Sequence, residues 1–93
     1  MLEPQRFRLE LGHLLATANA LQTLDPPSIR TALERHARGD WGELDPEDGT
    51  ANNQALRFGG RLLSVYRDRA GTKFYIITEA DRSVTTVLLP EDY

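Results

Sequence analysis

The sequence contains no cysteine, so disulfide bonds and thiolate chemistry are excluded for this chain. It has no apolar run approaching about 18 residues, the length that a membrane-spanning helix requires. It also shows no positively charged leader followed by an apolar segment. We therefore expect a protein that is neither exported nor inserted into a membrane. The lack of cysteine is consistent with a cytoplasmic location, where thiols stay reduced.

An excess of positive charge is also missing. The chain has 11 Lys and Arg against 14 Asp and Glu, which gives a net charge of −3. Proteins that bind nucleic acid through its phosphates normally carry a basic patch. The charge balance therefore argues against direct nucleic-acid binding. The length of 93 residues predicts a single domain, residues 1–93, with one modest core.

The C-terminal third of the chain predicts a β-sheet. Three runs rich in β-branched and aromatic residues follow one another: Arg61–Arg67, Lys73–Glu79 and Ser83–Leu89. Short turn signals separate them, with Gly71 in the first turn and Ala80-Asp81 in the second. This spacing predicts three consecutive antiparallel strands, a β-meander.

The turn lengths predict a register that places Asp68 opposite Lys73 and Glu79 opposite Arg82. In this register neither face of the sheet is polar. One face carries Leu63, Val65, Phe74, Ile76, Val87 and Leu89, and the other carries Leu62, Tyr66, Tyr75, Ile77, Val84 and Leu88. A half-exposed antiparallel sheet alternates apolar and polar residues. Both faces therefore need cover from helices, from the N-terminal segment or from a second copy, so a homodimer is one expectation.

The N-terminal half predicts that cover. Apolar and polar residues alternate over 6–16, which predicts a strand that could be a fourth member of the sheet. Three helices are expected, with Thr17, Asp25 and Asp45 at or near their starts: Ala18–Leu24, 27–38 and a third from Asp45 to Phe58. The predicted fold class is α+β, with an antiparallel sheet of three or four strands covered by N-terminal helices.

Several strings in the sequence resemble a known group of proteins. They are HARGDWG at 36–42, RLLSVY at 61–66, ITEADRSVTT at 77–86, and Leu89-Pro90 followed by Tyr93. The chain from about Leu9 onward is similar to small uncharacterised bacterial proteins carried on plasmids and other mobile elements. The resemblance implies a genetic setting, in which small proteins often control or counter host systems such as host defence. It implies no activity and no catalytic residues.

The densest acidic segment is residues 40–48, DWGELDPED. It contains Asp40, Glu43, Asp45, Glu47 and Asp48, together with Trp41, the only tryptophan of the chain. One interpretation is a solvated loop that leads into a helix, because acids favour the positive end of a helix, with Trp41 in the core. The other is a surface that binds the basic groove of a partner, with Trp41 as a partly exposed anchor. The predicted turn at Glu79, Asp81 and Arg82 forms a second charged cluster, interpreted either as a solvated hairpin tip or as part of the same surface.

His36 and Asp40 suggest a different function. A general base at His36, oriented by Asp40, with Arg35 or Arg38 holding phosphate, would describe a small RNase-like toxin. The alternative interpretation places His36 at a helix C-terminus, where it interacts with the dipole. Neither His13 with His36 nor the acids at 45–48 match a known zinc or calcium spacing. We therefore expect no metal, no cofactor and no assigned catalytic residue.

The leading hypothesis is a non-enzymatic interaction protein of a bacterial mobile element, which binds a host or element-encoded protein. Its most concrete version is an acidic inhibitor of a nucleic-acid-handling defence complex, of the anti-CRISPR or anti-restriction type. The RNase-like toxin is the alternative. A DNA-binding regulator is the weakest hypothesis, because the net charge is negative. Six arginines could still cluster in space: Arg6, Arg8, Arg30, Arg35, Arg38 and Arg57.

Overall fold

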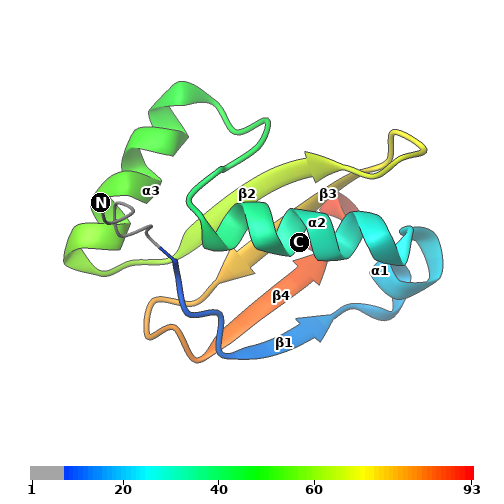
Figure 1. The fold of residues 1–93 in the computed structure, drawn as a ribbon, viewed down its shortest axis with the longest axis horizontal. Coiled ribbons are helices and arrows are strands. Elements are labelled where there is room, and N and C mark those ends of the chain that lie inside the picture. Colours follow the sequence, from blue (N-terminus) through cyan, green and yellow to red (C-terminus); the bar gives the residue numbers. More distant parts are fainter. Residues whose placement is uncertain (1–7) are drawn as a thin grey trace, which may run out of the picture.

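The computed structural model describes residues 8–93, which form a compact α+β fold around one mixed four-stranded sheet (Figure 1). The strand order is β1-β4-β3-β2, so the first and last strands of the chain lie side by side. The strands are β1 (His13–Ala16), β2 (Leu62–Arg67), β3 (Lys73–Thr78) and β4 (Val84–Leu88). The β-meander expected in the C-terminal third is present as β2, β3 and β4.

The expectation of a wholly antiparallel sheet is wrong, because β1 pairs with β4 in parallel. The strand expected over 6–16 is also shorter than predicted. Residues 6 and 7 lie outside the described residues, and Leu9 donates its backbone N–H to the carbonyl of Ala37 rather than to the sheet. Gly12, with φ of 66°, then redirects the chain into β1. A side chain at Gly12 would collide with the backbone of Ser83.

The predicted register of the first hairpin is wrong by one residue. Arg67, and not Asp68, lies opposite Lys73. The Asp68 carboxylate instead accepts hydrogen bonds from the backbone N–H groups of Ala70 and Thr72, at 3.0 and 2.9 Å, so it belongs to the turn. A slip of one residue exchanges the two faces of a strand. Leu62 and Tyr66 therefore share a face with Phe74, Ile76 and Val87, whereas Leu63 and Val65 lie on the opposite face.

The second hairpin is also longer than predicted. Glu79 donates its backbone N–H to Val84, and Arg82 sits inside the turn with a positive φ of 64°. The expected pairing of Glu79 with Arg82 is therefore wrong. The shift is two residues, which leaves each side chain of β4 on its predicted face.

Three helices precede the meander, within one or two residues of the expected ranges: α1 (Ala18–Thr23), α2 (Pro26–Ala37) and α3 (Pro46–Phe58). Thr17 caps α1 by accepting the N–H of Ala20, and Asp25 caps α2 by accepting the N–H of Ser28. Pro26 and Pro46 stand at the first positions of α2 and α3, where a missing N–H costs nothing. A short 3-10 turn, η1 (Pro90–Asp92), ends the described fold.

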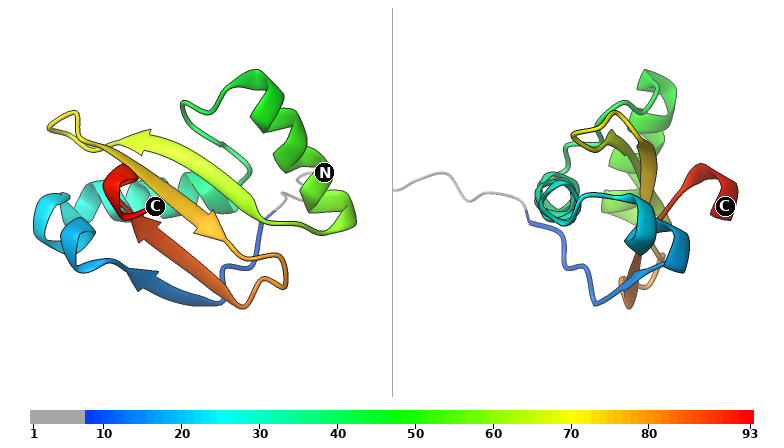
Figure 2. Two further views of the ribbon diagram at one scale, coloured as in Figure 1. Left: turned by 180° about the vertical axis from the view of Figure 1, so that it is seen from behind. Right: turned by 90° about the vertical axis from the view of Figure 1, so that its right-hand side faces the viewer.

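The sheet has an inner face, against which α2 packs, and an outer face. Figure 2 (right) shows the sheet nearly edge-on, with α2 on one side and the C-terminal turn on the other. The inner face forms the main core with residues of α1 and α2. Its buried members are Ala20, Leu24, Ala32, Tyr66, Phe74, Ile76, Val87 and Leu89. A second cluster beside α3 contains Leu9, Trp41 and Leu62.

Among the described residues, the outer face is covered by the short 3-10 turn η1 and not by α2 (Figure 2). It consists of the side chains that alternate with the inner set, and it includes Leu63, Val65, Tyr75, Ile77, Thr86 and Leu88. Tyr93 lies over part of it, with its ring edge-on to Tyr75 at a centroid distance of 5.9 Å. Within residues 8–93, no helix combines the length and the apolar composition that crossing a membrane would need.

Candidate protein-interaction surface

The acidic segment is held against the free edge of β2. Glu43 donates its backbone N–H to the carbonyl of Val65 at 2.7 Å, and Val65 donates its own N–H to the carbonyl of Trp41 at 3.1 Å. Gly42, between them, has a φ of 70°, and a Cβ at this position would collide with the Val65 carbonyl. Only glycine allows the segment to approach β2 this closely. The backbone of residues 41–43 therefore has a defined position.

Trp41 lies in the core rather than on the surface. It is 9% exposed and packs with Leu9 and Leu62. Its indole N–H donates to the side-chain carbonyl of Asn53 in α3 at 3.1 Å, so the polar atom of the ring is satisfied inside the protein. The structure favours the first interpretation of Trp41, and it leaves the neighbouring carboxylates as the exposed part of the segment.

Asp40 is engaged in a local ion pair. Arg35 donates to both of its carboxylate oxygens, from Nε at 2.7 Å and from Nη2 at 3.1 Å, and Gly42 donates its backbone N–H to the same group. The hydrogen bond from Arg35 is the main cause that lowers the pKa of Asp40. Asp40 therefore stabilises the turn after α2.

The remaining acids of the segment are exposed. Glu43 accepts from Arg67 at 3.1 Å, a pair in which both side chains are about half exposed. Asp45 precedes α3, and Glu47 and Asp48 lie in its first turn. These three carboxylates have no ion-pair or hydrogen-bond partner among residues 8–93. Their charge is therefore available to a ligand.

A groove of about 250 Å³ joins these acids to the outer face of the sheet. Its rim carries Glu43, Asp45 and Asp48, and its floor is apolar and aromatic. The floor residues are Leu44, Leu63, Val65, Tyr75 and Tyr93, with Lys73 at the side. We call this set the acidic groove. The rim could be predicted from the sequence, but the floor was not predicted. The signal for it was that both sheet faces are apolar, so that one of them could lack a helix.

Arg82, in the turn between β3 and β4, bonds to the protein's own backbone. The Arg82 guanidinium donates to the backbone carbonyls of Gly60 at 2.6 Å, Ala55 at 3.0 Å and Glu79 at 3.1 Å. Ala55 and Gly60 lie at and just after the end of α3, so Arg82 ties this helix terminus to the sheet.

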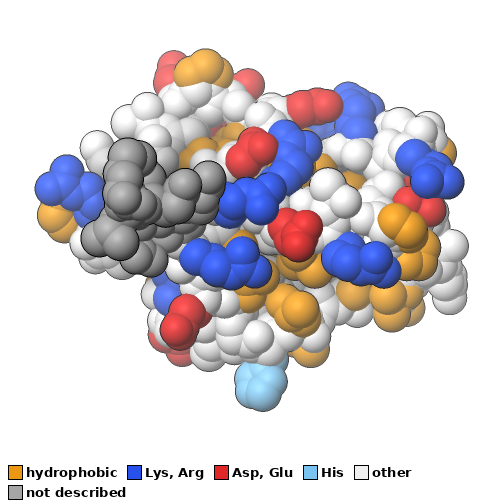
Figure 3. All heavy atoms as spheres, in the orientation of Figure 1, with side chains coloured by type: hydrophobic (Ala, Val, Ile, Leu, Met, Phe, Trp, Pro, Cys, Tyr) orange, Lys and Arg blue, Asp and Glu red, His pale blue; other side chains and the backbone are white. Residues whose placement is uncertain are grey.

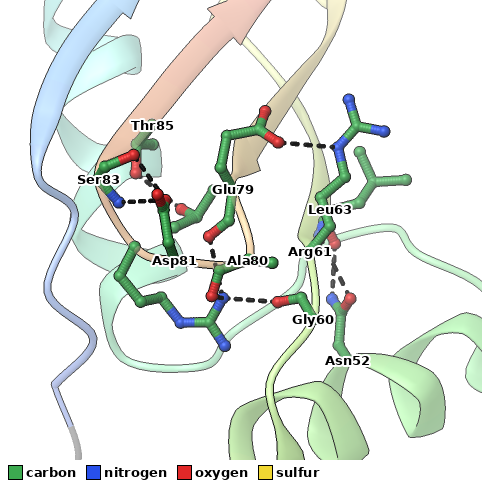
Figure 4. A network of polar contacts seen from close by, with 11 residues as sticks. Asn52, Gly60, Arg61, Leu63, Glu79, Ala80, Asp81, Ser83 and Thr85 are labelled. Carbon is green, nitrogen blue, oxygen red and sulfur yellow. Dashed lines mark hydrogen bonds and ion pairs between the residues drawn. The ribbon is translucent and has the colours of Figure 1, made fainter.

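The two acids of this turn have different environments. Glu79 pairs with Arg61 across a 3.6 Å gap, with both side chains about half exposed. Asp81 accepts hydrogen bonds from the hydroxyl and the N–H of Ser83, and these bonds lower its pKa (Figure 4). Glu79 lines a second hollow on the outer face, which also contains Tyr93. Of the turn residues, Glu79 is therefore the one that borders the outer face.

No protein-family model, curated protein or solved structure matches this chain.

Among residues 8–93 no three His, Cys, Asp or Glu side chains come together as a metal site would require.

His36, the residue that the sequence suggested as a general base, is fully buried, with no exposed area. Its Nδ1 lies 2.5 Å from the Ser64 hydroxyl and its Nε2 lies 2.9 Å from the Thr78 hydroxyl. Burial is the main cause that lowers its pKa to about 4, and the nearby positive charge of Arg82 contributes. The ring is therefore neutral at pH 7, inaccessible to a substrate, and not bonded to Asp40.

The hydroxyl network around His36 has one consistent direction. The Thr85 hydroxyl donates to the carbonyl of Leu11 at 2.7 Å, so the oxygen of this hydroxyl accepts a hydrogen bond from the Thr78 hydroxyl. Thr78 then accepts from His36 Nε2–H, which leaves Nδ1 to accept from Ser64. Every polar atom of this buried chain has a partner. These residues join α2 to three strands, which describes a structural role.

Basic side chains are present on both faces of the sheet, and Arg61 and Lys73 border the outer face. Figure 3 shows other basic side chains spread across the face over α2, with acidic side chains between them. Arg35 is paired with Asp40, and Arg69 lies 3.7 Å from Asp25. Arg6 lies outside the described residues. Arg57 is near the end of α3 and stacks over Phe58.

Proposed function

We propose that this chain is a non-enzymatic binding protein that holds a basic segment of a partner protein in the acidic groove. The observation that carries the proposal is the combination of an apolar floor with carboxylates that have no internal partner. Lys and Arg side chains have a long apolar stem and a charged end. Their stems would lie on Tyr75, Tyr93 and Leu63, while the charged ends reach Asp45 and Asp48. A purely apolar partner would leave these charges without a counter-charge.

The more specific proposal concerns the class of partner. A small acidic protein of a mobile element would inhibit a nucleic-acid-handling defence complex by occupying the basic surface that the complex uses for DNA or RNA. Complementary charge would speed this encounter at low salt and would weaken as salt is added. The carboxylates of the groove rim and Glu79 supply that charge. Asp40, Trp41 and Arg82 contribute by holding the surface in position.

Both ring nitrogens of His36 are engaged in the core, which argues against the RNase-like alternative. A general base must reach the proton that it removes. The basic face over α2 is interrupted by acidic side chains, which argues against the DNA-binding regulator as well (Figure 3).

The test compares two sets of neutral variants. Asp45→Asn, Glu47→Gln and Asp48→Asn together remove the charge while keeping residues that suit a helix start. The matched control is Glu10→Gln with Glu34→Gln, two exposed acids outside the groove. We expect the triple variant to bind the captured partner about 3- to 150-fold more weakly, because three lost ion pairs of about 0.2–1 kcal/mol each sum to about 0.6–3 kcal/mol. The control should bind normally.

A second measurement separates the general from the specific proposal. The partner is captured from a bacterial host lysate, and a labelled DNA or RNA oligonucleotide is then competed against this protein. Displacement of the oligonucleotide supports inhibition of nucleic-acid binding. Binding without displacement retains the groove and rejects the inhibitor. Unchanged binding by the triple variant and by Tyr75→Ala would reject the groove itself.

A further inference from the structure

The two edges of the sheet differ in how they are covered. At the β2 edge, residues 41–43 and the side chain of Asn52 occupy the backbone groups of Val65 and Leu63. At the β1 edge, no segment among residues 8–93 lies outside the strand. β1 is therefore the open edge of the described sheet, visible in Figure 1 as the outermost blue arrow.

The parallel pairing with β4 decides which groups of β1 are free. His13 donates its N–H to Ser83 at 2.9 Å, and Thr17 donates its N–H to Val87 at 3.0 Å. Alternate residues of a strand direct their backbone groups to the same neighbour. The N–H and C=O groups of Leu14 and Ala16 therefore point away from the sheet, and within the described part of the chain they have no partner.

This edge is apolar and uncharged. Leu14 and Leu15 are each 55% exposed, on opposite faces of the strand, and Leu21 in α1 is 65% exposed. From Leu14 to Leu24 the sequence contains no charged residue, although 27% of the chain is charged. Proteins usually protect an open edge with charges, with proline or with a bulge. β1 is short, with four residues, but it has no charge, no proline and no bulge.

We propose that β1 pairs antiparallel with β1 of a second copy of this chain, about a two-fold axis at Leu15. The outward N–H and C=O groups of Leu14 then bond to the C=O and N–H groups of Ala16 in the second copy. The groups of Ala16 bond in the same way to Leu14 of the second copy, so every free backbone group finds a partner. Leu15 lies opposite Leu15 of the second copy on the outer face. On the inner face, the large Leu14 side chain lies beside the small Ala16 of the second copy. Ala16 packs against the main core of its own chain.

Charge favours a second copy as the occupant of this edge. Two acidic chains repel each other, but the uncharged run brings no carboxylate to the contact, and His13 falls opposite Thr17. A basic partner segment would find no counter-charge here. The pairing is independent of the acidic groove, since β1 and β2 are at opposite edges. A dimer would carry two free grooves and would bind a repeated partner with added avidity.

The first test is sedimentation of the purified chain at micromolar concentrations. We expect a dimer for the natural sequence and a monomer for Leu15→Lys, because the substitution places two like charges directly opposite each other. Phe58→Lys is the control, a residue 78% exposed at the end of α3, away from the β1 edge, and it should remain a dimer. A monomeric natural chain would overturn the proposal, as would a dimer that Leu15→Lys leaves intact.

The absence of cysteine allows a sharper test of the register. Residues opposite each other in a non-hydrogen-bonded antiparallel pair have Cα atoms about 4.5 Å apart, which a disulfide can span. Under oxidation, Leu15→Cys should form a covalent dimer. In Leu14→Cys the two thiols lie diagonally across the axis, with Cα atoms more than about 7 Å apart, and should stay reduced. Cross-linking of Leu14→Cys but not Leu15→Cys would reject this pairing, and circular dichroism checks that both variants fold.

Discussion

The Ser64 hydroxyl and Nδ1 of His36 lie 2.5 Å apart in the core, where Nδ1 accepts a hydrogen bond from the Ser64 hydroxyl. This hydrogen bond requires a neutral imidazole, because a protonated ring has no acceptor. A histidine that the sequence suggested as a catalytic base is therefore a buried, uncharged link between α2 and the sheet.

The free energy of unfolding should decrease as the pH is lowered from about 6.5 to about 4, because in this range His36 binds a proton in the unfolded chain but not in the folded protein. The unfolded ring titrates near pH 6.5, whereas the folded ring titrates at about 4. The free energy of unfolding is unaffected by His36 above that range and decreases as the pH falls from 6.5 towards 4. The loss approaches about 3 kcal/mol.

Urea unfolding at a series of pH values measures this effect, with His36→Gln as the comparison. The glutamine amide retains a donor and an acceptor but does not titrate. The variant should be less stable at neutral pH and should show a smaller decrease in acid. Parallel pH profiles for the two proteins would mean that His36 is not the responsible group.

Asn52 is expected to protect the edge of β2. Its side chain donates to the carbonyl of Leu63 at 2.6 Å and accepts the N–H of the same residue at 3.2 Å. Asn52→Ala leaves both groups without this partner and should cost about 1–3 kcal/mol of unfolding free energy. Asn53→Ala, which removes only the bond to the Trp41 indole, is the neighbouring control and should cost less. Chemical denaturation measures the unfolding free energy of both variants. Equal losses for Asn52→Ala and Asn53→Ala would contradict the role assigned to Asn52.

Arg82 combines an unusual backbone conformation with hydrogen bonds to the end of α3. Both Arg82→Ala and Arg82→Gly lose those bonds, but glycine tolerates the positive φ. We therefore expect the glycine variant to be more stable than the alanine variant by about 1 kcal/mol. Hydrogen exchange near Phe58 should speed up in both. If the two variants were equally stable, the backbone of this turn would have to rearrange when the arginine is removed.

Much of the secondary structure could be predicted from local sequence. Caps at Thr17 and Asp25, and Pro46 at the start of α3, place the helix starts because they satisfy or avoid free N–H groups. The β-branched runs of the C-terminal third predicted the meander. The predicted register of the first hairpin was wrong because the Asp68 side chain bonds to the backbone of its own turn instead of pairing across the strands. A count of turn residues does not reveal such a bond.

The candidate surface was predicted only in part. The acids at 43–48 could be identified because charge is a property of the sequence. The floor under them could not, since Leu63 and Val65 were assigned to the opposite face by the one-residue slip. The burial of Trp41 and the engagement of Arg82 depend on neighbours distant in sequence, Leu9 and Ala55 among them.

By itself, the sequence determined the sheet-forming runs, the helix starts, the lack of thiol chemistry and the acidic character of residues 40–48. These depend on residue type and on neighbours a few positions away. Tertiary structure decided that β1 runs parallel to β4, that His36 is neutral and enclosed, and that an apolar floor meets unpaired carboxylates. The direction of a strand, the burial of a ring and the sharing of a groove arise from contacts between distant segments, whose free energies no local pattern records.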